Sequence, residues 1–276
     1  MRSSARGRGT TEGGGGGSWV RRWLGRAPEA PIPRLRRVLP PRRRAQGKSL
    51  KPAPERAELP GGAVLVKDGF SNVFVLPTGP RTVALIDCGM DPEAKAVEAA
   101  LKAQGLGPDA VEAVFITHGH GDHTGGCKAF PRARIMALAA EVGMIEGTAS
   151  AKSPMTGFSA PKPKPTGLKV ARALADGQVV DLGVLSIKAF AVPGHTPGSA
   201  AYAAGGVLYL GDAASVTDDD RLRSAAWIFS TDSGQAERSL RALAGRIAGE
   251  SPAVQTIAPS HSATAPAAVL AAYAAD

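Results

Sequence analysis

Imidazole and carboxylate side chains gather in one short segment of the chain, residues 117–126, which reads THGHGDHTGG. Three of the chain's five histidines lie there, and the candidate ligands are His118, His120, Asp122 and His123. Glycine permits backbone angles closed to other residues, so a glycine-rich turn lets several side chains converge on one point. Imidazole nitrogens and carboxylate oxygens are typical zinc ligands. We therefore interpret the cluster as a metal-binding segment rather than as surface histidines that lie close together by chance.

The other two histidines and two further aspartates each follow a short apolar run. His195 lies in the segment VPGHTPGS, His261 in PSHS, Asp212 in LGD and Asp87 in LIDCG. Loops at the ends of strands in a rigid scaffold commonly build binding and catalytic sites. Any one of these residues alone could be a helix cap or a surface group, but together they predict a single site.

The elements that must position these residues are visible as apolar runs separated by turn residues. The runs 63–66, 73–76 and 83–86 predict an antiparallel meander. Asp91, followed by Pro92, predicts the start of a helix that ends at Gly105, and Asp232 with Gln235 predicts a capping box. Further strands are predicted at 113–117, 134–138, 184–190, 200–203, 207–210 and 254–258, and further helices at 138–146, 235–247 and 265–274. Strand groups closed by helices in both halves imply two packed sheets with helices outside.

A proline-rich segment, residues 148–167, interrupts this pattern. It contains four prolines together with Met155 and Phe158, and it predicts no regular structure. A loop of this length inside a compact domain is commonly functional, for example a substrate lid, although a solvated insertion remains the alternative.

Positive charge is concentrated at the start of the chain. Residues 1–57 hold 15 of the 33 basic residues and three acidic ones, whereas the remainder has 18 basic and 21 acidic residues. We expect 1–57 to be a disordered Gly/Pro/Arg-rich extension, either non-functional, a targeting segment, or a contact for nucleic acid or membrane, and 58–276 to be the folded domain. Because that domain has no excess positive charge, the sequence argues against a nucleic-acid partner.

Two further expectations concern location and cysteine chemistry. No run approaches the ~18 apolar residues of a membrane span. In the absence of a clear signal peptide we expect a cytoplasmic protein, and the oligomeric state stays open. Cys88 and Cys127 are too few for a disulfide scaffold, so we expect two small buried free cysteines rather than a disulfide.

The motifs HxHxDH, GHTPG and the Gly-Asp strand end resemble the metallo-β-lactamase superfamily over residues 59–276. The resemblance implies an α/β fold, a four-layer αββα sandwich, with a dinuclear metal site at one edge of the sheets. It also implies that Asp212 bridges the metals and that Asp87 holds the ligand loop. His261 departs from the pattern, because many relatives place glycine around this histidine. The implied ligands are His118, His120 and His195 for one metal, and Asp122, His123 and His261 for the other.

Nitrogen and oxygen ligands without thiolate favour two Zn²⁺ ions, although Fe and Mn also accept them. A bridged metal pair lowers the pKa of bound water toward ~7 and so supplies hydroxide at neutral pH. Asp122 is then a candidate catalytic residue that accepts or relays a proton.

The superfamily includes thioester hydrolases, lactonases, β-lactamases, nucleases and redox enzymes, so residue differences must narrow the function. His120 stands where redox relatives carry glutamate, and Asp212 stands where β-lactamases carry cysteine or serine. No tyrosine lies in a predicted loop, which weakens the lactonase interpretation. The leading hypothesis is a small thioester or ester hydrolase, similar to hydroxyacylglutathione hydrolase (glyoxalase II) in its metal set.

Three alternatives remain. The first is a lactonase or a β-lactamase-like amide hydrolase. The second is a phosphodiesterase or nuclease acting on RNA, because such nucleases share the HGDH motif. The third is a non-catalytic descendant, against which the complete ligand set argues. Only 15 residues follow His261, so we do not expect the glutathione-binding helical region of glyoxalase II.

The expected substrate is a compact acyl compound. Arg221 and Arg223 follow Asp212 closely in sequence and are tentative contacts for an anionic group, with Met155 and Phe158 facing the same pocket. The alternative is that both arginines pair with the aspartates of 218–220 in solvent.

Overall fold

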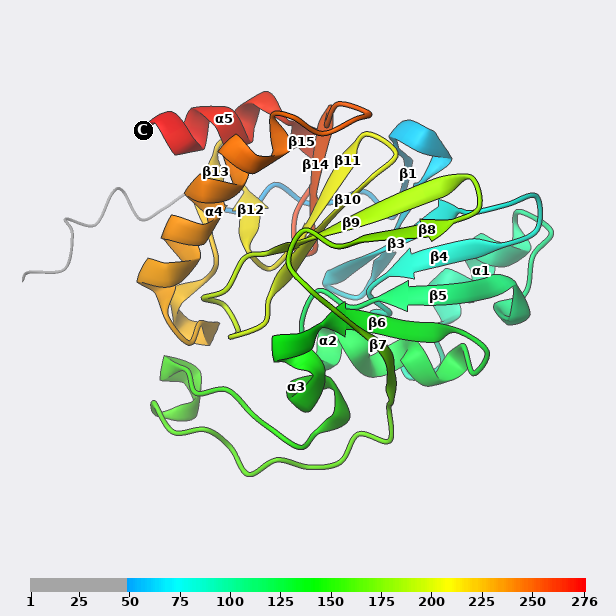
Figure 1. Cartoon of the computed structure of the whole chain (residues 1–276), viewed down its shortest axis with the longest axis horizontal. Helices are drawn as coiled ribbons and strands as arrows, with labels where there is room; N and C mark the ends of the chain where they lie inside the picture. Colours follow the sequence, from blue (N-terminus) through cyan, green and yellow to red (C-terminus); the bar gives the residue numbers. More distant parts are fainter. Residues whose placement is uncertain (1–48) are drawn as a thin grey trace, which may run out of the picture. The chain divides into compact units, whose positions relative to one another are not determined.

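Two β-sheets face each other in the computed structural model, which describes residues 49–276 (Figure 1). The first sheet has the order β1-β2-β3-β4-β5-β6-β7, and its strands are β1 (Arg56–Glu58), β2 (Val64–Asp68), β3 (Ser71–Pro77), β4 (Val83–Ile86), β5 (Val111–Phe115), β6 (Arg134–Leu138) and β7 (Val170–Leu174). The second has the order β15-β14-β11-β10-β9-β8, and its strands are β8 (Val179–Leu182), β9 (Leu185–Ala191), β10 (Ala200–Ala204), β11 (Val207–Gly211), β14 (Thr256–Pro259) and β15 (Ala265–Pro266). A separate hairpin joins β12 (Ala214–Val216) to β13 (Leu222–Ser224).

Helices cover the outer face of each sheet. The α-helices are α1 (Lys95–Lys102), α2 (Gly121–Thr124), α3 (Val142–Glu146), α4 (Ser233–Ile247) and α5 (Ala268–Ala275). Short 3₁₀ turns lie at η1 (Pro60–Gly62), η2 (Pro108–Ala110), η3 (Gly125–Ala129), η4 (Ala139–Glu141), η5 (Pro154–Thr156) and η6 (Trp227–Phe229). None of the helices in the described part of the chain is long and apolar enough to cross a membrane.

The layers follow from the two-residue alternation of side chains along a strand. In β3, Phe74 and Leu76 pack between the sheets with Tyr202 and Tyr209, while Val73 and Val75 face the opposite side. That outer side is covered by α1 and α3 through the buried side chains Val97, Leu101 and Ile145. On the second sheet, Leu240, Leu243 and Leu270 of α4 and α5 cover the outer face. The prediction of an αββα sandwich is therefore confirmed.

Most predicted elements are present, with shifted ends. The strand predictions 83–86 and 134–138 coincide with β4 and β6, and Asp232 caps α4 by accepting a hydrogen bond from the backbone N–H of Gln235. The first helix begins three residues later than predicted, because Ala94 has a left-handed conformation with φ of 48°. Sequence patterns missed β1, β7, β8, β12, β13 and β15. β7 illustrates the reason: most of its side chains are exposed at the sheet edge, so it lacks a buried apolar run.

The predicted domain boundary at residue 58 is too late. β1, which includes Arg56 and Ala57, pairs with β2, and Leu50 forms a bridge to Thr217. Lys51 also donates its backbone N–H to the Val216 carbonyl at 3.0 Å. Residues 50–57 are therefore part of the domain, and the rest of the predicted extension, residues 1–48, lies outside the described residues.

Cys88 and Cys127 form a disulfide, so the prediction of two free cysteines is wrong. Cys88 follows β4 and Cys127 lies in η3, and their Cα atoms are 5.2 Å apart. The Cys88 backbone N–H also donates to the His123 carbonyl at 2.8 Å. The fold thus brings together two residues 39 positions apart, which the local sequence around each cysteine does not encode.

The proline-rich segment 148–167 contains a single turn, η5, and no helix or strand of its own, as predicted. It leaves α3, runs beneath the start of α4 and returns to β7 (Figure 1). Its turn η5 lies against η6, which precedes α4.

Candidate metal centre

Five strands deliver the candidate ligands and their supports to one edge of the sandwich. β4 and β5 are parallel neighbours, so the residues that follow them, Asp87 and Thr117–His118, meet at the same edge. β11 and β14 are parallel as well, which places Asp212 beside the segment of His261. His195 follows β9 in the same sheet. The two sheets meet here through hydrogen bonds from Ala200 N–H to the Thr117 carbonyl at 2.8 Å and from Asn72 N–H to the Ser260 carbonyl at 2.7 Å.

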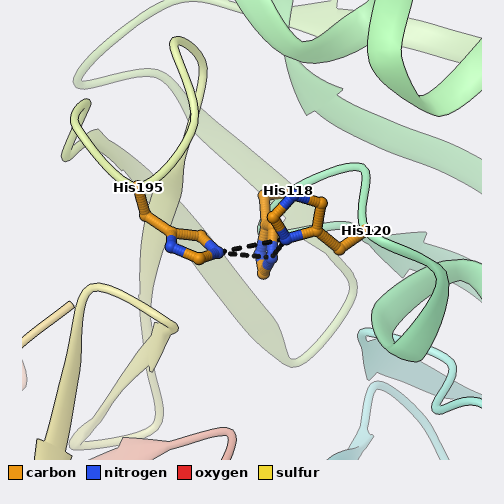
Figure 2. Close-up of side chains that lie close together, drawn as sticks. All are labelled: His118, His120 and His195. Carbon is orange, nitrogen blue, oxygen red and sulfur yellow. Dashed lines mark hydrogen bonds between the residues drawn. The ribbon is translucent and has the colours of Figure 1, made fainter. Parts of the chain in front are cut away.

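Three imidazoles, which we call the histidine triad, converge on one point: His118, His120 and His195 (Figure 2). His118 Nε2 lies 3.0 Å from His120 Nδ1, and His195 Nε2 lies 3.2 and 3.1 Å from those two atoms. Ligands of a tetrahedral zinc with bonds of about 2.0–2.1 Å lie about 3.3 Å apart. The triad therefore has the spacing of three ligands around one metal ion.

A second group, which we call the carboxylate half, lies beside the triad and contains Asp122, His123 and His261. The Asp122 Oδ2 atom lies 3.4 Å from His123 Nε2 and 3.2 Å from His261 Nε2. Asp212 faces both groups: its Oδ1 lies 3.3 Å from His123 Nε2 and 3.0 Å from His261 Nε2, whereas its Oδ2 lies 3.4 Å from His195 Nε2. One carboxylate could therefore contact two ions.

Two buried atoms at the centre of this arrangement support metal binding. His123 Nε2 and Asp212 Oδ1 lie 3.3 Å apart, yet neither atom makes a contact with the geometry of a hydrogen bond, although buried polar atoms are almost always satisfied. Both point into the space shared by the carboxylate half, where a cation would satisfy them. The donor set of nitrogen and oxygen atoms fits Zn²⁺, Fe or Mn.

Asp87 supports the ligands from behind. This buried carboxylate accepts hydrogen bonds from the Thr117 backbone N–H at 2.7 Å and the Thr117 hydroxyl at 2.8 Å. Its Oδ2 lies 2.7 Å from His123 Nδ1, so it can fix the ring orientation and leave Nε2 for a metal. Asp87 thus contacts the ligand loop from behind, through Thr117 and His123.

The two groups differ in proton affinity. Burial lowers the pKa of His118 well below its usual value and that of His195 to about 4. Burial would also lower the pKa of His123, but the carboxylates of Asp87 and Asp212 outweigh it and raise this pKa well above its usual value. At His261 burial is likewise outweighed, by Asp122 and Asp212, which raise its pKa to about 10.

Two contributors to the site were missed in the sequence. Phe70 accepts a hydrogen bond from His261 Nδ1 through its carbonyl at 2.9 Å, and its ring stacks on that imidazole. Glu141 in η4 is fully buried and accepts hydrogen bonds from the loops of the histidine triad. Burial raises the pKa of Glu141 even though those hydrogen bonds oppose it. The one available signal for Glu141 was a lone charged residue inside the small apolar segment 137–145.

The two predicted substrate arginines lie on or next to the β12–β13 hairpin, and both are exposed. Arg221 pairs with Asp276 at 2.9 Å. Tyr202 and Tyr209 are fully buried in strands of the second sheet, and the Tyr202 hydroxyl donates to the Ile116 carbonyl at 2.8 Å.

A pocket of about 520 Å³ lies between the proline-rich segment and η6. Ser230 connects the pocket to the metal centre, because its hydroxyl lies 3.4 Å from His195 Nδ1. Phe158 and Trp227 contribute exposed aromatic rings, 70% and 62% accessible. Met155 is exposed in η5 but does not line the pocket. The lining residues are Lys152, Pro154, Phe158, Trp227, Ser230, Thr231, Asp232, Ser233 and Gln235.

Comparison with known families gives one match over most of the domain. The model of the metallo-beta-lactamase superfamily matches residues 66–259. This range contains six of the seven candidate ligands and stops two residues before His261.

Curated relatives are hydroxyacylglutathione hydrolases. The chain is 38% identical over 133 residues to the protein of Alkalilimnicola ehrlichii, covering 48% of this chain and 42% of the relative. It is 35% identical over 144 residues to that of Anaeromyxobacter dehalogenans, covering 52% and 46%. The match thus spans less than half the length of these relatives.

Solved structures of similar fold include metallo-beta-lactamases. A B3 enzyme described as having an active-site glutamic acid superposes with a TM-score of 0.59 at 23% identity, covering 82% of this chain and 88% of that one. The metallo-beta-lactamase SMB-1 bound to 2-mercaptoethanesulfonate superposes with a TM-score of 0.56 at 26% identity, covering 76% and 81%.

Proposed function

The chain belongs to the metallo-β-lactamase superfamily, and we propose that it is a hydrolase that uses two Zn²⁺ ions to cleave a small thioester or ester. The observation that carries this proposal is the position of Asp212, whose two oxygens face the histidine triad and the carboxylate half at 3.4 and 3.0 Å. Seven ligand side chains exceed what one tetrahedral zinc ion uses. We assign His118, His120 and His195 to one ion, Asp122, His123 and His261 to the other, and Asp212 to both.

When bound, such a metal pair supplies activated water near neutral pH and electrophilic stabilisation of the oxygen atom of the attacked carbonyl. The chain's own residues prepare this chemistry. Asp87 and Thr117 fix the ligand loop, so that the donors are in place before the metal enters. Asp122 is one-fifth exposed, and we assign it the transfer of a proton between the attacking water and the leaving group.

Thioester or ester cleavage is supported by both residues and relatives. Asp212 stands at the position where the resemblance places cysteine or serine in β-lactamases, and the curated relatives are named hydroxyacylglutathione hydrolases. Amide hydrolysis of the β-lactamase kind is the second candidate, since the solved structures of similar fold include metallo-beta-lactamases. Lactone cleavage and RNA phosphodiester cleavage have no such support, and the acidic excess beyond residue 57 opposes the latter.

We place the acyl group of the substrate in the pocket beside His195. Exposed aromatic rings of Phe158 and Trp227 offer apolar contact area, and Lys152 is the cation that lines this pocket. The sequence-based alternative, an anionic group held by Arg221 or Arg223, requires Arg221 to leave Asp276. Comparing Lys152→Ala with each arginine variant separates the two possibilities. Replacing the residue that contacts the substrate should raise KM for anionic substrates about tenfold and leave KM for neutral substrates unchanged.

The hydrolytic proposal is tested by a substrate panel on zinc-loaded protein. Short-chain acyl thioesters and esters should be turned over, while lactones, β-lactams and phosphodiesters should be turned over at least about tenfold more slowly. The matched control is His118→Ala, which lacks one triad ligand. Turnover of β-lactams above that of thioesters and esters would replace the proposal by its second candidate.

A further inference from the structure

Glu141 is a buried carboxylate for which the hydrolytic mechanism above has no role. It lies at the end of η4, directly before α3, and its side chain is inaccessible to solvent. An ionised carboxylate is costly to bury unless several donors satisfy it. The partners of Glu141 therefore indicate why the fold retains a carboxylate there.

Those partners come from two separate loops. Oε1 accepts a hydrogen bond from the Gly119 backbone N–H at 2.8 Å. Oε2 accepts from the Thr196 hydroxyl at 2.9 Å and from the Gly198 backbone N–H at 2.9 Å. A single planar carboxylate thus joins two segments that are more than 70 residues apart in sequence.

The donors flank every member of the histidine triad. Gly119 lies between His118 and His120, and Thr196 directly follows His195. The distance between these two loops sets the separation of the His195 nitrogen from the other two, 3.1–3.2 Å. A displacement of either loop would change the spacing that suits a metal ion.

Close packing reinforces the same connection. A Cβ atom built on Gly119 would lie 2.7 Å from Met144 Cβ, and one built on Gly198 would lie 2.4 Å from the Glu141 backbone nitrogen. Real side chains do not tolerate such distances, so both loops press directly against η4 and α3. The positions of the two loops are therefore coupled through one short element.

Charge gives a second reason for a carboxylate here. Hydrogen bonds from N–H groups to an ionised acceptor are shorter and stronger than neutral ones. The carboxylate oxygen that faces the triad from the metal centre is Asp212 Oδ2, which lies 3.4 Å from His195 Nε2 and 4.0 Å from His118 Nε2. A fixed negative charge on the element behind both loops favours a cation at the triad.

We propose that Glu141 is the positioning residue of the histidine triad, which sets the geometry and the metal affinity of that half of the site and leaves the carboxylate half unchanged. The proposal rests on the metal assignment in the proposed function. It predicts a selective effect, because Asp87 and Phe70, not Glu141, support the carboxylate half.

The test is metal titration of Glu141→Ala and Glu141→Gln against the wild-type protein, with Zn²⁺ in competition with a chromophoric chelator and with Co²⁺ as a spectroscopic probe. Loss of a supporting partner typically weakens metal affinity by about 10- to 100-fold. We expect that loss at one of two sites in Glu141→Ala, with a changed Co²⁺ absorption spectrum, and an intermediate loss in Glu141→Gln. The glutamine variant preserves the side-chain shape and one acceptor, so it separates positioning from a folding defect.

Glu146→Gln is the matched control. Glu146 lies in α3, and its carboxylate accepts a hydrogen bond from the Val170 backbone N–H and pairs with Lys169, away from the ligand loops. The metal affinities and the Co²⁺ spectrum of the Glu146→Gln variant should equal those of the wild type.

Several outcomes separate this proposal from the function. Unchanged affinity and spectrum in Glu141→Ala, or equal losses at both sites, would overturn the positioning role and leave hydrolysis standing. A selective loss of affinity in Glu141→Ala, together with a wild-type protein that turns over no thioester or ester, would overturn the hydrolytic function alone.

Discussion

The histidine triad and the carboxylate half are adjacent, yet the chain holds them by different means. The triad rings His118 and His195 are almost inaccessible, and burial keeps them neutral. In the carboxylate half, Asp87 and Asp212 outweigh burial and raise the pKa of His123, Asp122 and Asp212 do the same for His261, and His261 is one-fifth exposed. A metal entering the triad therefore meets free nitrogen donors, whereas one entering the carboxylate half must displace protons.

The largest effect is expected where the two halves meet. Replacing Asp212 by alanine removes the one carboxylate that faces both groups, so both ions should bind weakly. Turnover should fall by more than the about 100-fold that is typical of losing a residue that only supports the ligands. Elemental analysis and steady-state kinetics measure the two losses. Retention of one tightly bound ion would show that the halves are independent.

His261→Ala should separate the halves. Wild-type protein is expected to bind about two metal ions per chain, and this variant should retain the ion at the triad, because His118, His120 and His195 keep their mutual contacts. Elemental analysis after dialysis measures the ratio. If the wild-type protein binds one ion and His261→Ala keeps its activity, the dinuclear assignment is wrong.

Asp87→Asn should weaken the carboxylate half more than the triad, which Asp87 reaches only through the Thr117 hydroxyl, 3.2 Å from His118 Nδ1. An asparagine amide can accept from Thr117 N–H but presents no charge to His123, so affinity at the carboxylate half should fall by about 10- to 100-fold. Metal competition titrations measure it. If Asp87→Asn and Glu141→Ala weaken the same ion, the two supports do not act on separate halves.

The disulfide provides a smaller, structural contrast. The disulfide between Cys88 and Cys127 joins the loop of Asp87 to η3, which follows the ligand-bearing helix α2. Removing the disulfide should therefore destabilise this loop, α2 and η3 more than the triad. We expect the double alanine variant to lose about 2–4 kcal/mol of unfolding free energy, with triad affinity unchanged. Urea unfolding of oxidised and reduced protein measures this loss. Such a bond is typical of proteins in oxidising compartments, in contrast to the expected cytoplasmic location.

The smallest effect is the pH dependence of the metal-free chain. The folded pKa of His195, about 4, lies below the ordinary 6.5, so its stabilising contribution is complete above pH 6.5 and is lost as pH falls toward 4. The folded pKa of His261 is about 10, so its contribution is complete below pH 6.5 and is lost as pH rises toward 10. NMR titration of the two imidazole rings should give a pKa below 6.5 for His195 and above 6.5 for His261. Titration of both near pH 6.5 would remove the electrostatic contrast between the halves.

The candidate ligands and the main layers could be predicted from the residue pattern alone. His118, His120, Asp122 and His123 are close in the chain, so their convergence needs only a glycine-rich turn after β5. The buried strands β4 and β6 were predicted with their observed ends, because a strand covered on both faces needs a continuous apolar run. Exposed edge strands such as β7 carry no such run and were missed.

The supports of the candidate ligands, in contrast, depend on contacts between distant parts of the chain. Glu141 reaches Gly119 across 22 residues and Gly198 across 57, and the disulfide spans 39. Arg221 donates a hydrogen bond to Asp276, 55 residues away. Each contact depends on which strands become neighbours at one edge of the sandwich. That choice follows from the packing of the whole core, and a local pattern of residues does not contain it.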